Sequence, residues 1–106
     1  MIVEVLAIDE CGNAEAAIDR VRVAVARLGL DDLPVELRWI RTRADAASTA
    51  FAGSPTITLD GVDLFPNDGQ TVDLACRVYA TPAGIAGLPT VEQIVERINE
   101  IRSTAR

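Results

Sequence analysis

The sequence predicts an α/β domain built on a mixed four-stranded sheet, with helices on both faces and a long excursion before the last helix. Three observations predict this class: a buried-strand pattern opens the chain, a helical pattern follows it, and an Asp-Gly turn later joins two short apolar runs. The length of 106 residues suits one domain, because independent domains usually have about 50 to 200 residues. We therefore expect a single domain over residues 1–106.

The first strand and the first helix have the clearest patterns. Residues 2–8 are nearly all apolar and rich in β-branched side chains, which is typical of a central strand covered on both faces. Between residues 13 and 30 apolar side chains recur every three or four positions, and this spacing predicts an amphipathic helix. We expect Asn13 to be its N-cap and Gly29 to end it.

A second strand and a second helix follow. Residues 35–40 alternate apolar and polar side chains, which predicts a strand. Thr42 and Asp45 form a capping-box pattern ahead of an alanine-rich stretch. This pattern predicts a short helix within residues 44–52 that ends at Gly53.

A hairpin and a final helix complete the regular elements. The Asp60-Gly61 pair separates the runs 56–59 and 62–65, as in a tight β-hairpin. Thr90 and Gln93 form a second capping box, and apolar side chains then recur on one face as far as Ile101.

Residues 66–89 have the least regular pattern and predict an irregular excursion. Within it, apolar side chains at positions 72, 74, 76 and 78 alternate with mostly polar ones. This alternation is compatible with a short extra strand whose apolar face, including Cys76, points into the core.

The composition excludes several kinds of site. The ten basic residues are all Arg, and the chain has no His. It therefore lacks a histidine base, an imidazole ligand for zinc, a phosphate-loop lysine and a Schiff-base lysine. The formal charge of −6 disfavours nucleic acid as a partner, since phosphate backbones carry the same sign. We expect neither a cofactor nor a metal.

The N-terminal residues and the lengths of the apolar runs indicate the cellular compartment of the protein. No basic segment precedes the first apolar run, and Glu4 and Asp9 interrupt it, so no export signal is expected. No run approaches the roughly 20 apolar residues that span a bilayer, so a membrane partner is not expected either. We expect a cytoplasmic protein, in which Cys11 and Cys76 are thiols rather than a structural disulfide.

The order of the elements, βαβαββα, resembles the thioredoxin-like superfamily. A right-handed crossover makes the first two strands parallel neighbours, and the hairpin adds antiparallel strands to the same sheet. Cys11 lies where the first strand meets the first helix, the position of the reactive cysteine in that superfamily. Ser54-Pro55-Thr56 lies just before the third strand, where the superfamily has a cis-proline facing the thiol.

A narrower resemblance covers nearly the whole chain. Residues 53–57, Asp60-Gly61, residues 76–79 and the capped last helix resemble small thioredoxin-like proteins sometimes labelled alkylmercury-lyase-related. That group begins its motif with Cys-Pro-Asn, whereas this chain has Cys-Gly-Asn at residues 11–13. The fourth position of a thioredoxin Cys-x-x-Cys is Ala14 here, so no local dithiol can form.

Cys11 is the candidate nucleophile. A thiolate at a helix N-terminus is stabilised by free backbone N–H groups and by the helix dipole, which lower the pKa of the thiol. The carboxylates of Asp9 and Glu10 act in the opposite direction if they lie close to it. The alternative is a small buried cysteine without chemistry.

The resemblance implies a substrate-binding role for Ser54, Pro55 and Thr56. With a cis Ser54-Pro55 bond, the main chain of Ser54 would face Cys11 and pair with a bound peptide or a glutathione-like molecule. The alternative is a trans proline that begins an edge strand.

Cys76 has two interpretations. Its alternation with apolar neighbours favours a core position. The topology, however, returns the excursion to the end of the sheet that carries Cys11, where Cys76 would be a resolving thiol. Arg77 beside it is a candidate to stabilise a thiolate or to bind a substrate carboxylate, whereas the commoner use of such an arginine is a surface ion pair.

Three functions remain open from the sequence. The first is a thiol redox protein in which Cys11 attacks a protein disulfide, a glutathione-like compound or a peroxide, and Cys76 or an external thiol resolves the product. The second is a thioredoxin-fold binding module without turnover. The third is a soft-metal binder in which both thiolates hold mercury or Cu(I).

Overall fold

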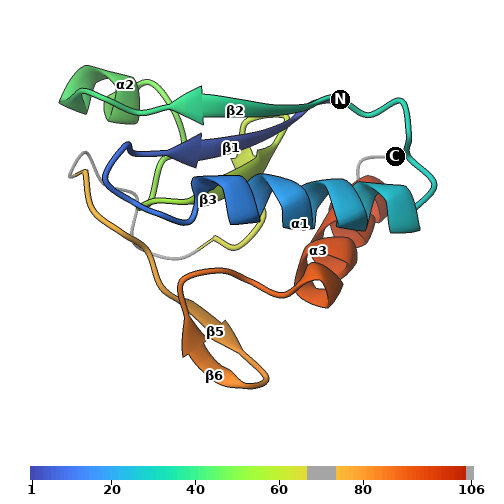
Figure 1. Cartoon of the computed structure of the whole chain (residues 1–106). Helices are drawn as coiled ribbons and strands as arrows, with labels where there is room; N and C mark the ends of the chain where they lie inside the picture. The colour runs from blue at the N-terminus through green and yellow to red at the C-terminus, as the bar shows by residue number, and fades with distance from the viewer. Residues whose placement is uncertain (67–73, 105–106) are drawn as a thin grey trace.

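A computed structural model of the chain describes residues 1–66 and 74–104. Nine elements follow one another along the chain in the order strand, helix, strand, helix, four strands and helix (Figure 1). Their bounds are β1 (Val3–Ala7), α1 (Ala14–Arg27), β2 (Val35–Trp39), α2 (Arg43–Ala47), β3 (Thr56–Leu59), β4 (Val62–Asp63), β5 (Tyr79–Thr81), β6 (Gly84–Ala86) and α3 (Val91–Thr104). Within the described ranges, no helix is long and apolar enough to cross a membrane.

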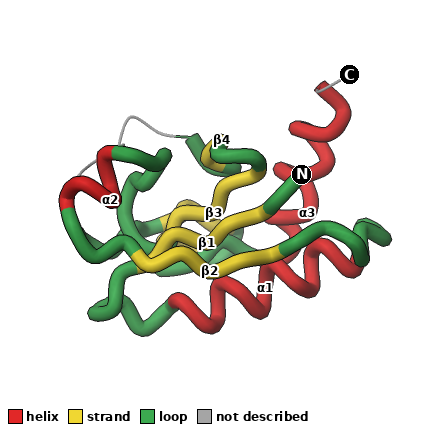
Figure 2. Tube along the Cα trace, turned by 90° about the horizontal axis from the view of Figure 1, so that it is seen from above, coloured by secondary structure: helices red, strands yellow, loops and turns green. Residues whose placement is uncertain are grey.

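The predicted mixed four-stranded sheet is confirmed. Its strands lie in the order β2, β1, β3, β4, as seen from above in Figure 2. β1 is parallel to β2 and antiparallel to β3, and β3 is antiparallel to β4. Asp60 and Gly61 both have positive φ, 52° and 82°, as the tight hairpin turn predicted between β3 and β4 requires.

Helices cover both faces of the sheet. Successive side chains of β1 point to opposite faces, so each face has apolar side chains that a helix can bury. On one face, Val3 and Val5 pack with the buried sides of α1 and α3 in the larger apolar cluster. On the other face, Leu6 packs with Ala46 of α2 and Phe51 in a smaller cluster, which also contains Cys11.

The helix ends agree with the sequence in part. Both predicted capping boxes are present: Thr42 and Asp45 cap α2, and the Thr90 and Gln93 side chains each bond the other's main-chain N–H at the start of α3. Asn13 occupies the N-cap position of α1, as predicted, and its side chain makes no capping hydrogen bond.

The second helix is shorter than its alanine content suggested. It ends at Ala47 rather than near Gly53. The hydroxyls of Ser48 and Thr49 both donate to the carbonyl of Asp45, at 3.0 and 3.2 Å. Such side-chain bonds compete with the helical hydrogen bonds of the backbone, and the chain leaves the helix so that Phe51 can be fully buried.

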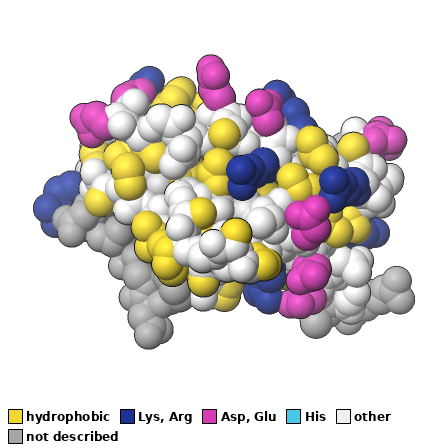
Figure 3. Space-filling model, turned by 60° about the horizontal axis from the view of Figure 1, so that its bottom comes forward, with side chains coloured by type: hydrophobic (Ala, Val, Ile, Leu, Met, Phe, Trp, Pro, Cys, Tyr) yellow, Lys and Arg dark blue, Asp and Glu magenta, His cyan; other side chains and the backbone are white. Residues whose placement is uncertain are grey.

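The excursion differs most from the prediction. Instead of irregular chain it contains the hairpin β5–β6, which projects from the body of the molecule (Figure 1). The face of the molecule in Figure 3 mixes hydrophobic side chains with separate arginine and acidic ones. Of the residues predicted to form an extra strand, 72 and 73 lie outside the described residues, and residues 74–78 make a single β-bridge, between Cys76 and Ser54.

The predicted alternation of burial within the excursion is reversed. Cys76 and Val78 are exposed, while Arg77 and Tyr79 are buried. The ring of Tyr79 packs edge-on against Phe65, and its hydroxyl donates to the carbonyl of Pro55. These long-range contacts decide which side faces inward.

Candidate functional site

Cys11 lies in the turn between β1 and α1, at the edge of the smaller apolar cluster. Its N–H donates to the carbonyl of Ile8, at 3.3 Å, and this turn places its thiol beneath the loop that precedes β3. The residue is 5% exposed. Its thiol donates to the main-chain oxygen of Ser54, at 3.6 Å, so the predicted proximity of these two residues is confirmed.

Ser54 is fully buried and organises the site with every polar group it has. Its hydroxyl accepts a hydrogen bond from the N–H of Ile8, at 3.0 Å. A hydroxyl that accepts from the backbone keeps its own hydrogen for another partner, and the Ser54 side chain also contributes to lowering the pKa of the Cys11 thiol. The Ser54-Pro55 peptide bond is cis, as the resemblance implied.

The main chain of Ser54 is occupied by the excursion. Its N–H donates to the carbonyl of Ala75 and its carbonyl accepts from the N–H of Arg77, both at 2.8 Å. These two bonds form the parallel bridge that aligns Cys76 with Ser54. The pairing groups that were predicted to receive a bound peptide are therefore satisfied within the chain.

Gly53 permits this close approach. It has a φ of 105°, a conformation that side chains rarely adopt. A Cβ added there would lie 2.8 Å from the Cβ of Arg77. Only glycine lets residues 75–77 lie against the loop before β3.

This bridge brings Cys76 to the site of Cys11, since the thiol of Cys11 donates to the carbonyl of the same Ser54. Both are free, Cys11 buried and Cys76 exposed. Burial raises the pKa of Cys11, but hydrogen bonds from the Ser54 side chain, the Asn13 main chain and the Cys76 side chain outweigh it. The net effect is a lowered pKa for Cys11, as expected for a thiol whose ionised form accepts several hydrogen bonds.

The pKa of Cys76 shifts the other way. Its hydrogen bond to Cys11 raises it first, followed by burial and by the negative charges of Cys11 and Glu10. The directions of the two shifts are therefore opposite, with a lowered pKa for Cys11 and a raised pKa for Cys76.

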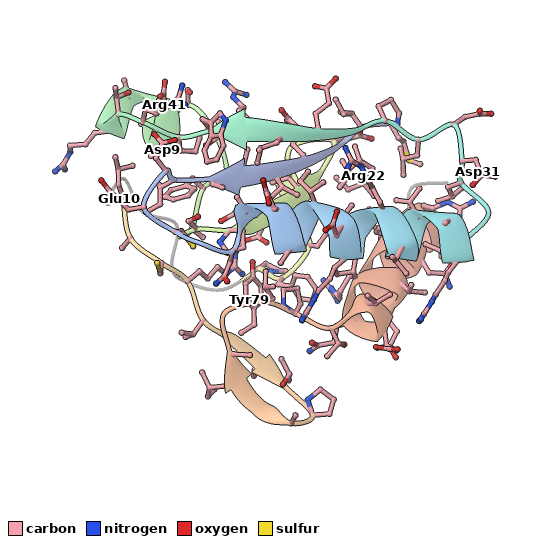
Figure 4. All side chains as sticks on the ribbon, in the orientation of Figure 1. Asp9, Glu10, Arg22, Asp31, Arg41 and Tyr79 are labelled. Carbon is pink, nitrogen blue, oxygen red and sulfur yellow. The ribbon has the colours of Figure 1, made fainter. Side chains whose placement is uncertain are left out.

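The two carboxylates before Cys11 have different surroundings. Asp9 forms a salt bridge with Arg41, at 3.0 Å, and both side chains lie beside α2 in Figure 4. Because Arg41 compensates Asp9, the carboxylate left to act on the thiols is Glu10, and its charge is among the causes that raise the pKa of Cys76.

The polar groups of Arg77 and Thr56, predicted to bind substrate, have partners within the chain. The guanidinium of Arg77 is buried in an ion pair with Asp63, at 2.8 Å, and also donates to the carbonyl of Phe65. The hydroxyl of Thr56 is fully buried, donates to the carbonyl of Gly53 and accepts from the N–H of Ala52. Pro55 is buried as well. These residues hold the loop and the excursion in place.

Three contributors to the site escaped the sequence analysis. These are the hydroxyl of Ser54, the main-chain N–H of Asn13 and the close approach at Gly53. The glycine directly before Ser54-Pro55 is the sequence signal from which the close approach at Gly53 could have been predicted.

No protein-family model, curated protein or solved structure matches this chain. Over residues 1–66 and 74–104, no group of three or more His, Cys, Asp or Glu side chains is arranged to hold a metal ion. Within the described residues, we therefore take Cys11 and Cys76 as the candidate site for chemistry.

Proposed function

We propose that this protein is a thioredoxin-like thiol–disulfide exchange protein in which Cys11 is the nucleophile and Cys76 the resolving thiol. The proposal rests on the bridge between Ser54 and Cys76, which brings the second thiol to the Cys11 site, and on the opposed pKa shifts of the two thiols, lowered for Cys11 and raised for Cys76. A lowered pKa makes more of the thiolate, the species that attacks a disulfide. The strand order and the cis Ser54-Pro55 bond support the thioredoxin-like assignment.

The exchange proceeds in two displacements. The thiolate of Cys11 attacks one sulfur of a substrate disulfide, forms a mixed disulfide and releases the first substrate thiolate. Cys76 then gives up its proton and attacks the sulfur of Cys11, which releases the second substrate thiolate and leaves a Cys11–Cys76 disulfide. The substrate gains two electrons, the protein loses two, and an external thiol reverses the change.

The packing around Cys11 affects which substrates reach it. Cys11 is 5% exposed, and Ala75 and Arg77 are bonded to the main chain of Ser54, the residue whose carbonyl accepts from the Cys11 thiol. A small disulfide such as glutathione disulfide is the suitable first probe, because it needs less displacement of this segment than a protein does.

The nucleophile is tested by the rate of iodoacetamide alkylation against pH, in the wild type, in Cys11→Ser and in Cys76→Ser. We expect Cys11 to reach its maximal rate at a lower pH than a free cysteine, and Cys76 at a higher pH. If both thiols react as ordinary cysteines, the proposal fails and the non-catalytic binding module is favoured.

The resolving step is tested with glutathione disulfide and mass spectrometry. In Cys76→Ser we expect a glutathione adduct to accumulate on Cys11, since nothing resolves it. In Cys11→Ser the adduct on Cys76 should form much more slowly. Faster attack by Cys76 would reverse the assigned roles and contradict the proposal.

A further inference from the structure

The outer edge of β2 is the long open edge of the sheet. Strand order places β2 at one side and the two-residue β4 at the other, and in the described part of the chain no strand pairs with the far side of β2. Leu37 and Trp39 are each 36% exposed. An open edge presents unpaired N–H and C=O groups that can template pairing with another strand.

The direction of these main-chain groups follows from the hydrogen bonds to β1. The carbonyl of Pro34 accepts from Val3, and the N–H of Ile40 donates to Ala7, at 2.9 and 2.8 Å. Because main-chain groups alternate in direction along a strand, the even-numbered residues of β2 face β1. The N–H and C=O groups of Val35, Leu37 and Trp39 therefore point outward.

The charges along this edge are antisymmetric about Leu37. On its N-terminal side the charged residues are acidic: Asp31, Asp32 and Glu36. On its C-terminal side, through residue 43, they are basic: Arg38, Arg41 and Arg43. Figure 4 shows Asp31 and Arg41 toward opposite ends of β2.

We propose that β2 pairs antiparallel with β2 of a second copy of this chain, about a twofold axis at Leu37. In this register the outward groups match, since Leu37 faces Leu37 of the partner subunit and Val35 faces Trp39 of the partner subunit. Glu36 then lies opposite Arg38 of the partner subunit, in the non-hydrogen-bonded position where cross-strand side chains are closest. The two four-stranded sheets become one.

The same charges argue against other arrangements of the edge. A parallel pair in register would place Glu36 beside Glu36 and Arg38 beside Arg38, which is destabilising. Charges of one sign would protect the edge from self-association, whereas this edge carries both signs in a self-complementary order. Within the chain, Glu36 is also the register neighbour of Glu4, so a cation from the partner relieves a pair of like charges.

The charge pairs are tested by sedimentation velocity over a range of protein concentrations. We expect the wild type to dimerise, with an association that weakens as salt is added. Arg38→Glu should raise the dissociation constant at least about tenfold, because both symmetry-related pairs become repulsive. The double change Glu36→Arg with Arg38→Glu should restore the dimer, since the pairs are attractive again. Arg102→Glu on α3 makes the same change of charge away from β2 and should leave the dimer intact.

The register is tested by crosslinking in a chain that carries Cys11→Ser and Cys76→Ser, so that the result does not depend on the proposed redox function. Directly opposed residues on the twofold axis have Cα atoms about 5.5 Å apart, within the range of a disulfide. Leu37→Cys should therefore give a covalent dimer on mild oxidation, and Val35→Cys should not. A wild type that stays monomeric, a dimer that ignores Arg38→Glu, or equal crosslinking at both positions would overturn the proposal.

Discussion

At the scale of single residues, Cys11 combines two opposed effects. Burial disfavours its thiolate, while three hydrogen-bond donors from separate parts of the chain favour it. The donors prevail because each is fixed by other contacts: the Ser54 hydroxyl is held by Ile8, and Cys76 by the bridge to Ser54. The lowered pKa of Cys11 thus depends on long-range contacts with Ser54 and Cys76 as well as on the main chain of Asn13.

Replacing Cys76 tests the contribution of its thiol. Cys76→Ala removes a donor to the Cys11 thiolate, so the pKa of Cys11 should rise and its alkylation rate near neutral pH should fall several-fold. Cys76→Ser keeps a hydroxyl donor and should shift the profile less. The measurement is the pH dependence of iodoacetamide modification of Cys11 in both variants. A profile for Cys76→Ala identical to that of the wild type would show that the Cys76 thiol has no effect on Cys11.

At the scale of elements, the contact between the excursion and the loop before β3 depends on Gly53. Gly53→Ala adds a Cβ at 2.8 Å from that of Arg77, in a backbone conformation unfavourable to alanine. We expect a loss of about 1 to 3 kcal/mol in the free energy of unfolding, from the strained φ alone, together with faster modification of Cys11 by bulky maleimides as residues 75–77 shift.

Gly61→Ala is the matched control for that change. Gly61 also has a positive φ, 82°, but a Cβ there meets no atom within 4 Å. It should lose stability without exposing Cys11. Equal maleimide reactivity in the two variants would mean that the excursion does not cover the thiol.

The buried ion pair between Arg77 and Asp63 fixes the other side of the excursion. Their side chains are 4% and 12% exposed, so Arg77→Met leaves a nearly buried carboxylate without its partner. We expect a loss of about 3 to 5 kcal/mol, measured by urea unfolding. Arg27→Met breaks the exposed pair with Glu92 and should cost no more than about 1 kcal/mol. Similar losses for the two variants would contradict a special role for the buried pair.

The elements also show what the sequence could predict. The Asp60-Gly61 hairpin, both capping boxes and the mixed four-stranded sheet follow from local patterns or simple topology, and the structure confirms them. The excursion was predicted wrongly, because its inward face is chosen by contacts of Arg77 and Tyr79 with residues far away in the sequence. Alternation along residues 72–78 contains no information about those partners.

Some features of the candidate site could likewise be predicted from the sequence, and others could not. Cys11, Ser54 and Pro55 were predicted from the resemblance to the thioredoxin-like superfamily. The proximity of Cys76 was one of two interpretations, the one that follows from the course of the chain around the hairpin. The burial of Arg77 was not foreseeable, since an arginine beside a cysteine looks the same whether it faces solvent or a buried aspartate.

At the scale of the whole molecule, the proposed disulfide would link the turn between β1 and α1 to the excursion. It would close a loop of roughly 65 residues, and the chain-entropy model gives about 4 kcal/mol for a loop of that length. The oxidised protein should therefore have a higher urea midpoint than the reduced protein. Cys76→Ser treated with the same oxidant is the control and should show no such increase. An oxidised form that is less stable would indicate that the two cysteines are joined only by distorting the fold.

The most direct test of the redox assignment is the product formed when the reduced wild type meets one equivalent of glutathione disulfide. We predict a species lighter by two hydrogens, with Cys11 and Cys76 joined in the peptide map, both closed to alkylation and both recovered with dithiothreitol. A persistent glutathione adduct on either cysteine, or two unchanged thiols, would contradict the assignment of Cys11 and Cys76 as a redox pair.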